Sequence, residues 1–590
     1  MSNNEPRPCY LGIDNGTQGL SVILTDATAA SGTLPVLATA EGASYDFVPD
    51  LADGCFEQRA SDWDYALQTA MKSIHEQMNE KDISFRILAI GISGQMHGEV
   101  LLDQDDKVLC PVRLWCDARN EAEGLELTKL FGTKVAKRAT VARFLWTIRN
   151  RRDDIASHVK HMTTPAGYLA FLLTNEYNLG IGDASGMFPM DGTTHNYHET
   201  MLHQFDRLVN DPAIAPIRTI LPNVRRAGEP AGQLTAKGAQ LLGLSEDHIG
   251  IPVAPAEGDQ VASLAGSLIG QPGNVSCSFG TSVCANTITH DTDIFEGVSP
   301  AIDHFCAADG KPILMVWLRN GTTYLNTIVN SYGMAMKTDD STKTNNPFET
   351  VMPMVIKAPA DCGGLLALPF MNDEPGLQVS PPSTTNETGT STNSSTAVIL
   401  GLQEGNATPG NIAKAALVST MFNLKLGRQT IDQHLKRPDG GTAHVQSKLI
   451  LSGGLTKTPA CGQILANVFD TPVVLLQGEG RAEEGCCWGA AVMARYRHMH
   501  HHANLPSGKE DDSTLPDWPS YLDSIAAAIQ QEHDVSTSTR QETSATTSDP
   551  TDQGHVRFTP NPEEVVIYEQ SFGRYQKLIQ LQPSLANVML

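Results

Sequence analysis

The sequence lacks an excess or a cluster of basic residues, and this excludes one large class of function. Its 590 residues include 42 Lys and Arg against 66 Asp and Glu, which gives a formal net charge of −24. No block of five or more basic residues occurs. Because binding to nucleic acid requires clustered Lys and Arg to neutralise phosphates, the composition argues against a nucleic-acid surface.

Long apolar runs and paired cysteines are also missing. No stretch approaches the length of a membrane span, and the polar N-terminus has no apolar signal region. The 11 cysteines are scattered without a CxxC pair, which favours free thiols in a reducing compartment. The sequence therefore predicts a cytoplasmic chain with neither nucleic-acid nor membrane partners.

The usual phosphate-binding loops are absent as well. The Walker pattern does not occur, and Gly478-Glu479-Gly480 lacks the third glycine of a GxGxxG loop. A strand–turn–strand pattern occurs twice instead, at residues 10–26 and 274–289. The two turns lie 264 residues apart (280 − 16), a domain-sized distance. The repeat predicts duplicated domains at residues 1–262 and 263–590.

The two turns carry the pairs Gly16-Thr17 and Gly280-Thr281. Glycine permits a tight turn, the threonine hydroxyl donates, and successive N–H groups can face one anion. Asp14 precedes the first turn and can hold Mg²⁺ directly or through water, whereas Ser278 occupies the matching place in the second. One such turn would be read as an ordinary hairpin, but two matching turns indicate a polyphosphate site.

Three further segments are candidates for ligand contact. Asp259 follows a predicted strand and opens a predicted helix, where it can act as a base for a hydroxyl group or as a helix N-cap. The polar Gln and His of the segment SGQMHG at 93–98 can form hydrogen bonds with a polyol. The alternative is a loop histidine whose hydrogen bonds are made with the backbone. The turn after strand 449–452 can approach a flat ring such as adenine, or simply start a helix.

The remaining patterns concern organisation. Residues 101–103 resemble the end of a hairpin partner for strand 87–92. Polar insertions are predicted near 380–396 and 505–555, the second containing a short helix at 521–531. A C-terminal helix near 561–582 should dock on the second domain through the apolar face Tyr568, Phe572, Tyr575 and Ile579.

Two segments carry tempting side chains but favour simpler interpretations. The histidines at 498–502 have no supporting metal-ligand spacing. The adjacent Cys486 and Cys487 favour packing over redox chemistry.

Together these elements resemble the FGGY carbohydrate kinases of the actin-like ATPase superfamily. The resemblance covers nearly the whole chain except the polar insertions and rests on an ordered set of motifs. These are GIDNGT (12–17), the FEQR…W stretch (56–63), GISGQMHG (91–98), LWCDAR (114–119), GDASGM (182–187), EGDQVAS (257–263), SFGTS (278–282), LSGG (451–454) and a Gly-Ala-Ala turn at Gly489. It implies two α/β domains of ribonuclease H-like fold, each a mixed sheet with helices on its faces, and a central cleft.

The resemblance also implies roles for individual residues. Asp259 would accept the proton of the sugar hydroxyl, and Asp14 would organise Mg²⁺. Met96 and His97 would contact the sugar, with Gln260 beside them. The ATP-binding residues would be Thr17, Gln18, Gly280, Thr281, Ser282, Gly453 and Gly454. Within the family the motifs most resemble xylulokinases, which phosphorylate the C5 hydroxyl of D-xylulose.

Several positions depart from the family pattern and keep alternatives open. Residues 371–375 read Met-Asn-Asp-Glu-Pro where a Glu-Arg-Thr-Pro-like stretch is common, and Val418-Ser419 stands where many members carry Glu-Gly. Arg319-Asn320-Gly321 is closer to the eukaryotic branch of xylulokinases, and Gln260 replaces a frequent Asn. A kinase for ribulose, sedoheptulose or glycerol remains an alternative, as does a non-catalytic sensor. A homodimer also remains open.

Overall fold

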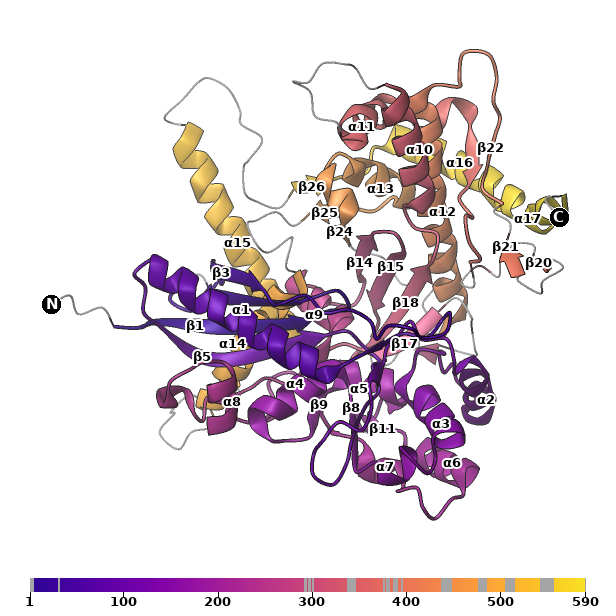
Figure 1. Cartoon of the computed structure of the whole chain (residues 1–590). Coiled ribbons are helices and arrows are strands. Elements are labelled where there is room, and N and C mark those ends of the chain that lie inside the picture. Colours follow the sequence, from indigo (N-terminus) through magenta and orange to yellow (C-terminus); the bar gives the residue numbers. More distant parts are fainter. Residues whose placement is uncertain are drawn as a thin grey trace. The chain divides into compact units, whose positions relative to one another are not determined.

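The first strand–turn–strand segment forms the centre of a five-stranded sheet in the computed structural model (Figure 1). β1 pairs antiparallel with β2 and parallel with β5, and β5 pairs parallel with β13. The strand order is β13 (Glu257–Gly258), β5 (Phe85–Gly94), β1 (Arg7–Asn15), β2 (Leu20–Asp26) and β3 (Val36–Glu41).

The second strand–turn–strand segment has the same place in a seven-stranded sheet. β14 pairs antiparallel with β15 and parallel with β24, and β24 pairs parallel with β25. This repeats the pairing of β1 with β2 and β5, and of β5 with β13, which supports the predicted duplication. The order is β17 (Ile302–Cys306), β18 (Pro312–Leu318), β15 (Val283–Ile288), β14 (Asn274–Phe279), β24 (Lys448–Gly453), β25 (Val473–Leu475) and β26 (Val556–Phe558).

The structure describes most of the chain, in segments separated by gaps. The described residues are 5–29, 32–290, 294–295, 299, 302–336, 346–374, 377, 383–385, 391–393, 396–436, 448–475, 485–503, 515–541 and 556–588. Half of the two predicted polar insertions lies outside them. Within the second, helix α15 (Trp518–Gln541) covers the short helix predicted at 521–531.

The chain divides into two compact units. Unit 1 comprises Met1–Gln271, Phe305–Ile313 and Gln477–Gly554, and unit 2 comprises Pro272–His304, Leu314–Leu476 and His555–Leu590. The sequence predicts one boundary near residue 262. In the structure the first unit extends to Gln271, and it also includes the later segment Gln477–Gly554. The physical reason is helix α14 (Gly485–Ala503), which packs on α9 (Asp259–Gly266), β1 and β5.

Helix α14 lies unusually close to the sheet of unit 1. A Cβ atom added to Gly12 would lie 2.1 Å from the Cys487 carbonyl oxygen, and one added to Gly91 would lie 1.8 Å from that of Ala490. Gly94, three residues after Gly91, instead faces α4 (Pro165–Thr174). Because side chains alternate along a strand, α14 and α4 cover opposite faces of the sheet.

The other helices surround these sheets. Further helices of unit 1 are α1 (Ala60–Glu80), α2 (Glu121–Phe131), α3 (Thr140–Asn150), α5 (Ile181–Met187), α6 (Glu199–Val209), α7 (Ile217–Ile220) and α8 (Ala236–Leu241). Those of unit 2 are α10 (Thr323–Ala335), α11 (Pro347–Lys357), α12 (Pro409–His434), α13 (Cys461–Phe469), α16 (Pro562–Ile579) and α17 (Gln582–Val588). Among the described residues, no helix has both the length and the apolar character needed to cross a membrane.

The predicted C-terminal helix is present as α16. Tyr568, Phe572 and Tyr575 are buried in the core of unit 2, and Ile579 packs against that core. The Tyr575 hydroxyl donates to Asn423 of α12 at 2.6 Å. The apolar face read from the sequence is therefore confirmed.

The hairpin predicted at residues 101–103 is wrong. β6 (Val100–Leu102) pairs antiparallel with β8 (His161–Thr163), about sixty positions later, and not with β5. Short apolar segments do not specify their partner strand, which tertiary packing selects.

Candidate functional site

Three parallel strands of unit 1 end side by side. In the register of the sheet, Asp14 of β1 lies opposite Ser93 of β5, and Ser93 lies opposite Glu257 of β13. Ligands of open α/β sheets bind at the carboxyl ends of such strands. The segments that follow β1, β5 and β13 are therefore the ones from which a site can be built.

Those segments contain the residues predicted for catalysis and sugar contact. The Gly16-Thr17 turn follows β1, Met96 and His97 follow β5, and Asp259 follows β13. Asp259 is the first residue of α9, and the N-cap is Gly258, so the helix-cap alternative for Asp259 is not met. The strand-to-helix change predicted at this residue is confirmed.

The carboxylates at this edge influence one another. Burial and the nearby charge of Asp14 raise the pKa of Asp259 to about 7, although hydrogen bonds from Gln260 oppose the change. Burial also raises the pKa of Asp14, and the Ser93 hydroxyl partly offsets this effect. A carboxylate whose pKa is near 7 accepts a proton at physiological pH more readily than an ordinary aspartate does.

Two more buried carboxyl groups, absent from the predicted set, adjoin Asp259. Burial and the charge of Asp259 raise the pKa of Asp183 to about 8, despite the hydrogen bond from Thr164. Burial raises the pKa of Glu257 well above its ordinary value, with Asp183 adding to the effect. Both residues stand in the motifs GDASGM and EGDQVAS, but sequence alone does not reveal that their side chains are buried.

Met96 and His97 are held by two glycines. The His97 Nδ1–H donates to the Gly186 carbonyl oxygen at 2.9 Å, and the residue has a positive φ of 70°. A Cβ on Gly186 would lie 2.8 Å from the His97 ring, and one on Gly258 would lie 2.2 Å from Met96 Cγ. Both glycines are thus required for these side chains to occupy their positions.

The Thr17 hydroxyl already takes part in a hydrogen-bond network. It donates to Gln95 Oε1 at 3.1 Å and accepts from Trp115 Nε1 at 3.0 Å. Gln58 donates to the Thr17 carbonyl oxygen at 2.8 Å. The sequence predicts this hydroxyl as a donor to phosphate, and a phosphate would have to compete with Gln95 for its proton. Gln18, next in the turn, is exposed.

The second Gly-Thr turn lies at the corresponding edge of the sheet in unit 2. Gly280 N–H donates to Ser282 O at 2.9 Å, and Thr281 and Ser282 are exposed. Phe279, before the turn, lies opposite Gly453 of β24 in the parallel register. Gly453 has a positive φ of 79°, and a Cβ there would lie 2.5 Å from the Phe279 carbonyl oxygen. The structure therefore brings Gly280 and Gly453 together.

The two turns differ in length. The first closes through Gly16 N–H to Gly19 O and connects the paired residues Asn15 and Leu20. The second connects Phe279 to Val283 and is one residue shorter. The alignment of Gly16 with Gly280 thus describes the start of each turn but not its end.

The remaining motif residues, Gly489, Cys486 and Cys487, contribute to the packing of α14. Gly489, predicted in a turn, lies inside α14. Cys486 Sγ–H donates to Asp259 O at 3.4 Å and Cys487 Sγ–H to Gly12 O at 3.2 Å, in agreement with the packing interpretation. Across the described segments, no cluster of three or more His, Cys, Asp or Glu could hold a metal ion, the His-rich part of α14 included.

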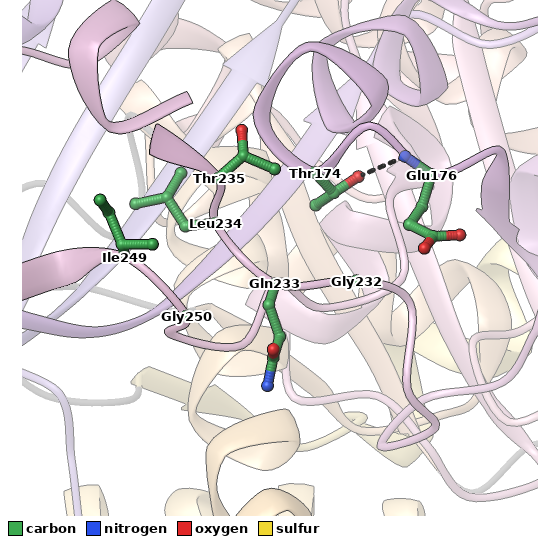
Figure 2. Close-up of a pocket in the computed structure, with 8 residues that line it drawn as sticks. All are labelled: Thr174, Glu176, Gly232, Gln233, Leu234, Thr235, Ile249 and Gly250. Carbon is green, nitrogen blue, oxygen red and sulfur yellow. Dashed lines mark hydrogen bonds between the residues drawn. The ribbon is translucent and has the colours of Figure 1, made fainter. Parts of the chain in front are cut away.

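A hollow of about 440 Å³ occurs elsewhere on unit 1 (Figure 2). It is lined by Thr174, Glu176, residues 232–235 and residues 249–250. Figure 2 shows the Thr174 hydroxyl accepting the Glu176 N–H. No predicted site residue lines this hollow.

Comparison with known proteins matches both halves of the chain to one family. The model of the FGGY family of carbohydrate kinases, N-terminal domain, matches residues 9–266, and the C-terminal domain of that family matches residues 275–498. A xylulose kinase of Haemophilus influenzae is 27% identical over 499 residues, covering 82% of this chain and 90% of the relative. One of Bacillus subtilis is 23% identical over 497 residues, covering 82% and 87%.

Solved structures of related proteins share the fold. A xylulose kinase from Brucella ovis has a TM-score of 0.72 at 20% identity, covering 98% of this chain and 100% of that one. A glycerol kinase from Plasmodium falciparum, determined with ADP, has a TM-score of 0.71 at 17% identity, covering 98% and 99%. The fold therefore does not separate sugar substrates, but with the two family matches it identifies the chain as a member of the FGGY family of carbohydrate kinases.

Proposed function

We propose that this kinase transfers the γ-phosphate of ATP to the C5 hydroxyl of D-xylulose, giving xylulose 5-phosphate. The observation that carries the proposal is the gathering of Asp14, Met96, His97 and Asp259 at one edge of one sheet. The xylulose kinases that align along 82% of the chain support this sugar over others. The free cysteines support a reducing compartment such as the cytoplasm.

In the proposed mechanism Asp259 accepts the proton of the attacking hydroxyl. Its raised pKa suits this task, because a base with a pKa near the working pH is both deprotonated and sufficiently basic. Met96 and His97 contact the sugar, with the His97 ring oriented by Gly186, and Gln260 lies beside Asp259. These residues orient one hydroxyl group toward the phosphate.

Asp14 fits a magnesium ion. Its Oδ1 is buried and has no hydrogen-bond partner among the described residues. Mg²⁺ is commonly bound by one or two carboxylates together with water and substrate phosphates, so one aspartate is sufficient. When bound, the ion would offset the negative charge of the transferring phosphate.

The nucleotide is proposed to use the exposed turns. In unit 2 the phosphates face Gly280, Thr281 and Ser282, and the adenosine approaches Gly453 and Gly454. In unit 1, Thr17 and Gln18 are proposed to contact phosphate. Turns of this kind can bind phosphate through backbone N–H groups without a lysine-containing loop.

The sugar is tested by measuring ADP release with xylulose, ribulose, sedoheptulose and glycerol as acceptors. We expect the largest kcat/KM with xylulose. A larger value with another acceptor would reassign the substrate within the family. Release unchanged by every sugar would favour a non-catalytic sensor and contradict the proposal.

The pH dependence tests Asp259 directly. Because the free base must be deprotonated, kcat/KM for the sugar should fall below an apparent pKa of about 7. A single ionisation of this kind makes activity at pH 5 roughly a hundredfold lower than on the alkaline plateau. The measurement is a set of initial rates from pH 5 to 9 with coupling enzymes in excess. An acid limb centred near pH 4 would contradict the raised pKa of Asp259.

A further inference from the structure

Two buried glutamates, one in each unit, bind backbone N–H groups of a segment distant in sequence. Glu257 is 1% exposed in unit 1, and Glu374 is 0% exposed in unit 2. A carboxylate removed from water is costly unless hydrogen bonds replace its hydration. The segment that each glutamate binds therefore indicates the role of that glutamate.

Glu257 binds the start of α5. Its Oε2 accepts the Asp183 N–H at 2.8 Å, and its Oε1 accepts the Gly182 N–H at 3.3 Å. A Cβ on Gly180 would lie 2.2 Å from the Glu257 carboxyl carbon, and one on Gly182 would lie 2.6 Å from Oε2. The segment can reach the carboxylate only because both positions are glycine.

Helix α5 in turn holds the residues proposed to contact the sugar. Its Gly186 accepts the His97 Nδ1–H, and the same glycine lies against Met96. Glu257 itself precedes Asp259 by two positions in the chain. One buried side chain thus fixes the distance between the proposed base and the proposed sugar contacts.

Glu374 binds the segment that supports the second Gly-Thr turn. It accepts the Arg319 N–H at 3.0 Å, the Asn320 N–H at 2.8 Å and the Asn320 Nδ2–H at 3.1 Å. The Asn320 side chain also donates to the carbonyl oxygens of Asn372 and Asp373. Two segments that depart from the family pattern are therefore joined to each other.

The next residues of that segment hold the turn from behind. Gly321 N–H donates to Thr281 O at 3.0 Å, and Thr322 donates to Gly280 O through both its N–H and its hydroxyl at 2.9 Å. A Cβ on Gly321 would lie 2.6 Å from each of these carbonyl oxygens. Because these bonds hold the carbonyl groups of Gly280 and Thr281, the conformation of the turn depends on residues 319–322.

We propose that Glu257 and Glu374 are positioning residues, the first for the sugar and the second for the nucleotide. The inference rests on the proposed function, because it assigns the sugar to the edge of unit 1 and the phosphates to the Gly280 turn. It adds that two buried carboxylates outside the predicted site control the affinities for the two substrates separately.

The test compares Glu257→Gln with Glu374→Gln in the full chain. Each change keeps the size of the side chain but replaces one acceptor oxygen by an NH₂ group, which meets a backbone donor. Glu257→Gln should raise the KM for the sugar at least tenfold and leave the KM for ATP within twofold. Glu374→Gln should do the reverse. The acceptor is the sugar that the wild-type chain phosphorylates best.

Glu123→Gln is the matched control, since Glu123 is also buried in unit 1, at 7% exposure, but pairs with Arg149 of α3. It should change neither KM. Equal changes in both KM values for either glutamate, or none, would overturn the inference by indicating a general structural role. Should a Gln variant fail to fold, Glu257→Asp or Glu374→Asp retracts the carboxylate by one carbon and gives the same comparison.

The inference and the proposed function fail in different ways. A wild-type chain that phosphorylates no sugar contradicts the proposed function. An active wild type whose two variants lose the substrate-specific pattern contradicts only the inference. Calorimetric titration of the sugar and of ADP into each variant repeats the comparison at equilibrium, independently of turnover.

Discussion

Replacing Asp259 by asparagine is expected to lower kcat by about 10²–10⁴-fold, the contribution typical of a positioned general base. Asparagine has the same shape but cannot accept the hydroxyl proton. Since Asp259 opens α9 and is not its N-cap, the substitution leaves the helix start intact. Single-turnover measurement of sugar phosphate formation checks the result, because it isolates the chemical step from product release.

The same variant should be more stable than the wild type at alkaline pH. The pKa of Asp259 is about 7 in the folded chain and 3.8 as the ordinary value, so the folded state binds the proton more tightly. The free energy of unfolding of the wild type therefore decreases as the pH rises from about 4 to about 7, and Asp259→Asn removes this loss. A gain of even about 1 kcal/mol raises Tm by roughly 2–4 °C for domains of 150–250 residues.

Exposed Asp247 of unit 1 provides the control for both measurements. Asp247→Asn should leave kcat and Tm unchanged, at pH 5 and at pH 8. Near-normal turnover of Asp259→Asn would remove the residue from the mechanism. A Tm difference that does not shrink at pH 5 would show that the buried charge is not its cause.

Gly489→Ala is expected to destabilise unit 1 by more than about 3 kcal/mol, at the upper end of overpacking substitutions. The added Cβ would lie 2.0 Å from the Ala262 carbonyl oxygen of α9 and 2.8 Å from the Gly266 nitrogen. Both contacts involve backbone, so no side-chain rotation relieves them. Because α9 begins at Asp259, its displacement would also lower activity. Urea unfolding and the ADP-release assay measure the two effects.

Gly573→Ala is the matched control for this substitution. Gly573 is also inside a helix, α16, but a Cβ there meets no described atom within 4 Å. Alanine has a higher helix propensity than glycine, so this variant should be equal to or up to about 1 kcal/mol more stable than wild type. Equal stability of Gly489→Ala and Gly573→Ala would contradict the close packing of α9 and α14.

Local patterns predicted the elements that depend on neighbours in sequence. The alternation of apolar residues identified β1, β2, β14 and β15, and the spacing of Tyr568, Phe572 and Tyr575 identified the buried face of α16. Asp259 was placed at a strand-to-helix change for the same reason. The glycines at 16, 280 and 453 marked turns, and Gly453 has a positive φ of 79° that few other residues adopt.

What the sequence did not reveal depends on contacts between distant segments. Nothing around Gly489 shows that its partner is Ala262, so a buried helix was interpreted as a turn. The bonds of Glu257 to α5 and of Glu374 to Asn320 are equally remote. The hydroxyl of Thr17 looked available because its partners, Gln95 and Trp115, are contributed by other loops.

The return of α14 to unit 1 has a consequence for synthesis on the ribosome. Residues 485–503 are translated after most of unit 2, yet they pack on β1, β5 and the helix that starts at Asp259. Between Gln271 and Ala503 lie 232 residues (503 − 271), which take roughly 12–46 s at about 5–20 residues per second. During that interval the nascent sheet exposes one apolar face. The chain therefore presents a natural substrate for chaperones, and its kinase activity can arise only after residues 485–503 have been translated.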